Sequence, residues 1–398
     1  RKWKAAPYEI QEEYSTNTKR PPYLQQATLA SDTTPLLDIA VMPIQQPDTP
    51  ITLNLAGENF RLTPGEETEL VGKTFSDLEQ LLALHRFSWI SRSDDKNISG
   101  WVGIIFEAWL EKHGDRSEAW VWHPYTVAER LINLIGFSKK HGLPGPQEKS
   151  LAFLAQHGPA IFEQLEYYGE AHTGNHLTNN GRGLYLGGLY LGFEDWAEIG
   201  GQILIEEGKR IFTPRRILRE GSSHYHLLAT RWYVECWMAA RKHNRPESQA
   251  LEEIAVRALS VASFFDMPAG FPLVGDVSPD CSTDHLSGLI KKDSSGWLAS
   301  LDEESSFALT GLWNKMPQIE LDDLVEDGWL RKNIGPWSIL WHYCPDGWSF
   351  LPGHGHRDFG GFELHFNDMP LFLDVGRQSY GPSGDKDISA KMHNTLLI

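Results

Sequence analysis

The strongest constraint on the fold is a helical periodicity that runs from about residue 75 to about residue 312. The candidate helices follow one another without strands between them: 102–113, 124–141, 147–168, 181–191, 194–212, 223–243 and 247–265. Gly- and Pro-containing breaks separate several of them. Val127, Leu131 and Ile135 share one face of the second helix, which is the spacing of a buried stripe. This series predicts helical hairpins closed into a toroid or stacked as a solenoid, and the lack of a fixed-period repeat favours the toroid.

Towards the C-terminus the pattern changes to that of antiparallel strands. Residues 337–343 and 362–366 alternate as half-buried strands do, and residues 371–375 return as a further strand after a turn at 367–370. A β-sandwich needs more strands than these to cover both sheets. We therefore expect the sequence to be a fragment of a longer protein.

The expected fold class is α+β, with an N-terminal α/α toroid followed by an antiparallel β-sandwich domain that is incomplete in this chain. Residues 1–70 are expected to form an arm with short strands, residues 71–330 the toroid, and residues 331–398 the start of the sandwich. No transmembrane segment or signal peptide is visible. The protein is then periplasmic or secreted if a leader was removed, and cytoplasmic otherwise. The sequence does not indicate an oligomeric state.

Charge and composition limit the possible partners. The formal net charge of -17 argues against nucleic acid, because phosphate binding depends on a basic surface. An acidic substrate must therefore meet local positive charge, for which Arg215, Arg216 and Arg219 are candidates; a solvated helix end is the alternative interpretation. The 15 Trp residues suit sugar stacking and helical core packing equally. Three widely spaced cysteines predict no disulfide framework and no all-cysteine zinc site.

Two polar clusters introduce helices in the predicted toroid. Asn175 and His176, within residues 173–180, supply an amide and an imidazole that suit carboxylate binding and proton transfer; a simple helix cap is the alternative. In residues 220–226, Tyr225 is flanked by two histidines whose rings would steady or perturb the phenol, although a packed tyrosine is the plainer interpretation.

A third cluster belongs to the β region. His354 and His356 form a His-x-His pair that would place two imidazoles on one side of a strand. Asp374 and His393 are able to complete a zinc site with this pair, whereas a chance pair of surface histidines is the alternative.

Together these clusters resemble the heparinase II/III-like polysaccharide lyases. Residues 122–133 look like an early toroid helix of that family, and the Asn-His turn, the Glu-Gly-Ser-Ser-His-Tyr-His stretch and the Gly-His-Gly-His-Arg-Asp motif follow in the family's order, with Asp374 and His393 after them. The resemblance implies a toroid, a C-terminal β-sandwich and a catalytic cleft between them. It also implies an acidic, 4-linked uronate polymer as substrate, cut by β-elimination.

The resemblance assigns roles to matching positions. Asn175 neutralises the substrate carboxylate, and His176 neighbours it or shares that work. Tyr225 is the proton donor and also a candidate base, and His354 is the base or its partner. The substrate contacts it implies are Glu220, His226 and Arg357. The metal ligands it implies, for a structural zinc, are His356, Asp374 and His393.

Two other functions fit the same sequence. A toroid glycoside hydrolase needs two opposed carboxylates, and Glu194 with Asp195 or Asp276 with Asp280 are the candidates. A catalytically silent glycan-binding or polysaccharide-assembly protein is the other. The sequence does not identify the polymer or distinguish endo from exo action.

Overall fold

The chain is described by a computed structural model that covers residues 19–30, 39–43, 45–92, 97–117, 119–172, 174–343, 353–377, 379–380 and 384–395. Contacts group the described residues into two compact units. The first takes in the residues up to Tyr168 together with His176–Ile203, and the second takes in Gly169–Asn175 and the residues from Leu204 onward. This grouping differs from the three parts suggested by the sequence pattern, because the C-terminal strands share a unit with the helices before them.

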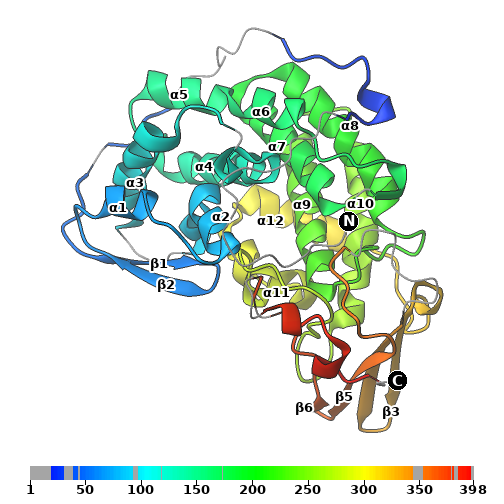
Figure 1. The fold of residues 1–398 in the computed structure, drawn as a ribbon. Helices are drawn as coiled ribbons and strands as arrows, with labels where there is room; N and C mark the ends of the chain where they lie inside the picture. Colours follow the sequence, from blue (N-terminus) through cyan, green and yellow to red (C-terminus); the bar gives the residue numbers. More distant parts are fainter. Residues whose placement is uncertain are drawn as a thin grey trace. The chain divides into compact units, whose positions relative to one another are not determined.

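The first unit joins a β-hairpin to a set of helices (Figure 1). Strand β1 (Ile51–Leu55) pairs antiparallel with β2 (Glu58–Leu62). The two turn residues, Ala56 and Gly57, have φ values of 49° and 91°, the left-handed geometry of a tight hairpin turn. The helices are α1 (Glu67–Val71), α2 (Leu78–Arg86), α3 (Ile98–His113), α4 (Pro124–His141), α5 (Gln147–Ala155), α6 (His157–Glu163), most of α7 (Asn175–Leu191) and the first part of α8 (Glu194–Ile211).

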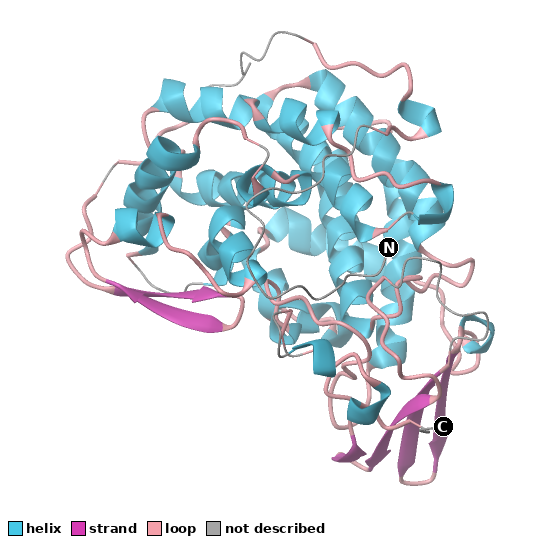
Figure 2. Cartoon of the chain, in the orientation of Figure 1, coloured by secondary structure: helices cyan, strands magenta, loops and turns pink. Residues whose placement is uncertain are grey.

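The second unit combines helices with one antiparallel sheet (Figure 2). Its helices after α8 are α9 (Ser223–Lys242), α10 (Ser248–Ala262), α11 (Thr283–Lys291) and α12 (Glu303–Asn314). Its strands are β3 (Trp329–Ile334), β4 (Trp337–His342), β5 (Gly361–Phe366) and β6 (Met369–Phe372), hydrogen-bonded in that order. Among the described residues, no helix is both long enough and apolar enough to cross a bilayer.

Most of the predicted helices are present; α4 has the predicted ends, at residues 124 and 141, and others differ. The helix predicted at 147–168 is two helices, α5 and α6, which meet at Gln156, and α6 ends at Glu163. The helix predicted to begin at residue 181 begins at Asn175 instead. Helices α1, α2, α11 and α12 were not among the predicted helices; α1, α2 and α11 are short, with five, nine and nine residues.

The strands also differ in detail from the prediction. The return strand predicted at 371–375 is β6, which already begins at Met369, so the predicted turn is shorter than expected. The turn is made by Asn367 and Asp368, with Asn367 at a φ of 52°, and Phe366 pairs directly with Met369. Strands β2 and β3 were not predicted.

The sheet of the second unit has an apolar face opposite a covered face that mixes polar residues with the core residues Trp329 and Leu340. Its covered face carries polar side chains at Ser338, His342, Glu363 and His365. The opposite face carries apolar side chains that pair across β4 and β5: Trp337 with Phe366, Ile339 with Leu364, and Trp341 with Phe362. Trp337 and Trp341 are 41% and 44% exposed. An apolar face of this kind is typical of the inner face of a β-sandwich.

Candidate active site

Asn175 is the first residue of α7 and lies in the second unit, where two contacts fix it. Its backbone N–H donates to Oε1 of Glu220 at 2.7 Å, and its side-chain Nδ2 lies 3.1 Å from Nε2 of His354. The residue is only 3% exposed. Gly174 permits this close approach, since a Cβ there would lie 2.6 Å from the Glu220 carboxylate. Asn175 is therefore not at an open loop tip, as the sequence suggested, but is held against His354.

His354 lies between the amide of Asn175 and a buried carboxylate. Its Nδ1 is 2.9 Å from Oδ2 of Asp276, and Nε2 of His356 is 2.9 Å from Oδ1 of the same carboxylate. Burial raises the pKa of Asp276, but the hydrogen bonds from His354 and His356 outweigh it and hold the pKa well below the usual range. An ionised carboxylate only accepts hydrogen bonds, so Nδ1 of His354 donates to Asp276; in the neutral form of the ring, the lone pair is then on Nε2, which faces Asn175.

Tyr225 lies in the first turn of α9, which begins where the hydroxyl of Ser222 accepts the backbone N–H of Tyr225. Its ring stacks on the ring of His354, with centroids 3.4 Å apart and planes inclined by 14°. Its hydroxyl is 3.4 Å from that of Tyr380, over whose ring the Arg377 guanidinium lies at 4.2 Å. The cluster therefore joins an amide, an imidazole and two phenols from four separate segments.

The two histidines that flank Tyr225 are both buried, and the ring of His224 lies edge-on to the Tyr225 ring with centroids 6.0 Å apart. Burial lowers the pKa of both His224 and His226 to about 4, so both are neutral near pH 7. His226 is completely buried, and its ring nitrogens bond to the backbone of Leu218 and Ala258. The predicted substrate contact of His226 is therefore wrong, because no atom of its ring is left to meet a ligand.

Glu220 and Arg357, the two other predicted substrate contacts, lie in different surroundings from each other. Glu220 binds the backbone of Asn175 through its carboxylate, and its backbone carbonyl accepts the N–H of His354 at 2.8 Å, so it holds two members of the cluster in place. Arg357 is exposed, and its backbone N–H bonds to Ile388. A substrate contact by either residue remains a prediction.

His176, the next residue after Asn175, belongs to the first unit and has its own carboxylate partner. Its Nδ1 is 2.6 Å from Oε1 of Glu166, which also lies 3.5 Å from Nε2 of His123. Burial raises the pKa of Glu166, but the two imidazoles and the hydrogen bonds from His176 and Asn180 hold it at about 2. The His176 side chain is 49% exposed. The Nδ1 atom of His176 is therefore held by Glu166, while the rest of the side chain is partly open to solvent.

Two of the three predicted metal ligands, Asp374 and His393, lie in a buried cluster with Asp358. Ligand atoms of Asp358, Asp374 and His393 all lie within 4.8 Å of one another, and all three residues are buried. Nδ1 of His393 is 2.9 Å from Asp374, while its Nε2 is buried without a hydrogen-bond partner. Nδ1 of His356 and Oδ2 of Asp358 are likewise buried without one. Orphaned nitrogen and oxygen atoms of this kind fit a zinc-type ion.

This metal cluster differs from the predicted set in one residue. Asp358, which the sequence analysis left without a role, joins Asp374 and His393, while His356 donates to Asp276 and lies with its ring centroid 5.0 Å from that of His393. The sequence held one signal for Asp358, since it ends the Gly-His-Gly-His-Arg-Asp motif. Asp276, Arg377 and Tyr380 lie outside the motifs that were assigned catalytic roles, so the tertiary contacts alone connect them to the cluster.

Comparison with solved structures identifies the fold. A crystal structure of heparinase III matches with a TM-score of 0.57 and 19% identity over 80% of this chain and 55% of its own. A second heparinase III matches with a TM-score of 0.50 and 16% identity over 85% of this chain and 62% of its own. The chain thus spans little more than half the length of these proteins. Sequence comparison finds no matching family model and no matching curated protein. The fold is therefore the predicted one, the helical toroid and β-sandwich architecture of heparinase III.

Proposed function

We propose that this chain carries the catalytic cluster of a polysaccharide lyase that cleaves a 4-linked, uronate-containing acidic glycan by β-elimination. The observation that carries the proposal is the contact among Asn175, Tyr225 and His354, three side chains from distant segments of the second unit. The likeness in fold to structures titled heparinase III supports it.

The first task of such a site is to make the C5 proton of the uronate removable. The Nδ2 group of Asn175 donates to the substrate carboxylate in place of Nε2 of His354, which lets charge from C5 delocalise onto that carboxylate. An amide does this without the desolvation cost of a buried cation. Because Asp276 holds the proton on Nδ1, the freed Nε2 of His354 takes the C5 proton.

The second task is to expel the leaving oxygen. The electron pair of the broken C5–H bond forms the C4–C5 double bond as the C4–O4 bond breaks, and Tyr225 gives its phenolic proton to O4. The hydroxyl of Tyr380 lies 3.4 Å from that of Tyr225 and is placed to orient it or to restore its proton. Arg377, stacked on Tyr380, brings a positive charge to this side of the cluster.

A zinc ion at Asp358, Asp374 and His393 has a supporting role in this proposal. These residues would hold the ion, which would neutralise their buried charge and tie the segments around β5 together. His356 connects this region to the active site, since it bonds to the Asp276 carboxylate that also orients His354. An ion held by these residues would stabilise the segment that presents His354.

A glycoside hydrolase is disfavoured by the same contacts. Asp276, one of its candidate carboxylates, accepts hydrogen bonds from two imidazoles, and its pKa is held below the usual range. A general acid in a hydrolase needs a raised pKa. A silent glycan-binding protein would have no need for a histidine with a fixed tautomer beside a stacked tyrosine.

The proposal is tested by mixing the protein with a panel of uronate polymers and following ultraviolet absorbance. A lyase creates an unsaturated uronate that absorbs, a hydrolase creates reducing ends without that chromophore, and a binding protein creates neither. With the active polymer, Tyr225→Phe should keep binding and lose turnover by roughly 100- to 10,000-fold. Tyr233→Phe, on the same helix but bonded to the Leu204 carbonyl, is the control. Full activity of the Tyr225→Phe variant would remove the phenol from the mechanism.

A further inference from the structure

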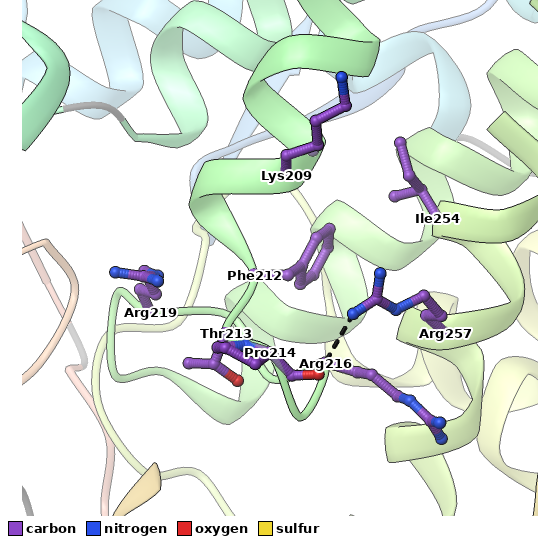
Figure 3. Close-up of a pocket in the computed structure, with 9 residues that line it drawn as sticks. Lys209, Phe212, Thr213, Pro214, Arg216, Arg219, Ile254 and Arg257 are labelled. Atoms are coloured by element: carbon purple, nitrogen blue, oxygen red, sulfur yellow. Dashed lines mark hydrogen bonds between the residues drawn. The ribbon is translucent and has the colours of Figure 1, made fainter. Parts of the chain in front are cut away.

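A second feature of the second unit is a basic pocket outside the catalytic cluster (Figure 3). It has a volume of about 100 Å³ and lies between the end of α8, the hairpin formed by residues 211–219, and α10. Its lining residues are Gly208, Lys209, Phe212, Thr213, Pro214, Arg216, Arg219, Ile254 and Arg257. Four of these side chains are cationic and none is acidic. In a chain with a net charge of -17, this is a concentrated positive site.

Most of this charge is not neutralised within the described part of the chain. Lys209 pairs with Glu206 at 2.8 Å, and Arg215, next to the pocket, pairs with Glu326. None of the three arginines Arg216, Arg219 and Arg257 forms an ion pair with a described carboxylate. Three guanidinium groups around one pocket repel one another, so an anionic ligand would relieve that repulsion.

The pocket wall is a tightly bonded hairpin and not a loose loop. Phe212 bridges to Leu218, the N–H of Thr213 donates to the carbonyl of Ile217 at 2.8 Å, and the N–H of Arg219 donates to the carbonyl of Ile211 at 2.8 Å. Arg216 has a φ of 85°, a left-handed conformation that is unfavourable for arginine. The hairpin therefore fixes the backbone positions from which Arg216 and Arg219 extend.

The arrangement of the cations suits an extended anion better than a compact one. Arg257 points towards the hairpin and donates to the carbonyl of Pro214, whereas Arg216 and Arg219 point to different sides of it (Figure 3). The charges thus spread along the hairpin instead of converging on one point. The second arm of the hairpin continues directly from Arg219 into Glu220, which holds Asn175 and His354.

We propose that this pocket is a second binding site for an acidic polysaccharide, whose carboxylate or sulfate groups lie along Arg216, Arg219 and Arg257. The inference rests on the proposed function for the identity of the polymer, but not on turnover. A polymer bound at both places would be anchored next to the segment that carries Glu220, and would stay attached between cleavage events.

The test compares two double variants in the Tyr225→Phe background, so that the polymer is not degraded during the measurement. Arg219→Gln with Arg257→Gln removes two pocket charges while keeping side-chain length. Lys242→Gln with Lys291→Gln removes two exposed charges of the same unit outside the pocket and is the matched control. The affinity for fluorescently labelled heparan sulfate is measured by anisotropy at several salt concentrations, and again with a fully desulfated chain.

We expect the pocket variant to bind about tenfold more weakly than the control, with a shallower dependence on salt. A loss confined to the sulfated chain assigns the pocket to sulfate, and a loss with both chains assigns it to carboxylate. Equal affinity of the two variants for both chains overturns the inference. If the wild type turns over the polymer but the pocket and control variants bind it equally well, only the pocket proposal is rejected. If the pocket variant binds more weakly but the wild type makes no unsaturated product, only the lyase reaction is rejected.

Discussion

The two units each contain a buried carboxylate held between two imidazoles, and the comparison shows what such a pair contributes. In the first unit Glu166 contacts His123 and His176. In the second unit Asp276 contacts His354 and His356. Both carboxylates have lowered pKa values despite burial, because hydrogen bonds favour the ionised form. Each therefore fixes a proton on the ring nitrogen that faces it.

The two clusters differ in the groups that surround His354 and His176 on the side away from the carboxylate. The far nitrogen of His354 meets the amide of Asn175, and its ring stacks on Tyr225, so the fixed lone pair is aimed at other reactive groups. His176 is half-exposed, and its ring packs at 4.7 Å from that of Tyr125 in the same unit. Only the second carboxylate–imidazole pair is therefore surrounded by the further groups that the proposed elimination would use.

The largest effect is expected from Asp276→Asn, which replaces an acceptor with a group that can also donate. The proton of His354 would no longer be fixed on Nδ1, and turnover should fall on the order of 100- to 10,000-fold. Initial rates by ultraviolet absorbance measure this, with Asp280→Asn as the control. Turnover within a few-fold of wild type would show that His354 does not need this partner.

The metal cluster should give the next largest effect. His393→Ala removes one ligand and leaves Asp374 and Asp358 as buried carboxylates without their imidazole, so the unfolding free energy should drop by about 1–3 kcal/mol. Bound zinc should fall in parallel when metal content is measured by mass spectrometry. Lys391→Ala, an exposed change two residues away, should alter neither value. Wild-type protein that contains no zinc would reject the metal assignment.

The smallest catalytic effect is expected from Glu166→Gln in the first unit. The variant loses ionic hydrogen bonds with His176 and Asn180, and we expect a stability loss of about 1–2 kcal/mol with less than a tenfold change in turnover. Urea unfolding measures the stability loss and initial rates measure the turnover. Glu148→Gln, an exposed position on α5, is the control. A loss of turnover as large as that of Asp276→Asn would show that the two clusters act together.

The stability difference at Glu166 should depend on pH with a definite sign. The folded-state pKa of about 2 lies below the ordinary value of 4.5, so the ionised carboxylate stabilises the folded state above pH 4.5. That contribution is lost as the pH falls from 4.5 towards 2. The gap between wild type and Glu166→Gln should shrink over the same interval, and a gap that widens in acid would contradict the assignment.

Helix α9 shows why sequence alone identified Tyr225 but not its partners. Consecutive residues on a helix point about 100° apart, so His224, Tyr225 and His226 face three directions. Helical periodicity alone does not show which of them faces the cluster. The structure turns both histidines into the core and stacks His354, more than a hundred residues away, on the tyrosine.

The sequence by itself determined the helical series, the change to strands after about residue 330 and the motifs that hold Asn175, Tyr225 and His354. These follow from local periodicity, capping and turn chemistry, which act between residues close in the chain. Only the tertiary structure decided that Asp276 joins His354 to His356, that Asp358 lies beside Asp374 and His393, and that His226 is a core residue. Those outcomes depend on packing between distant segments, and no local pattern encodes which buried carboxylate will meet which imidazole.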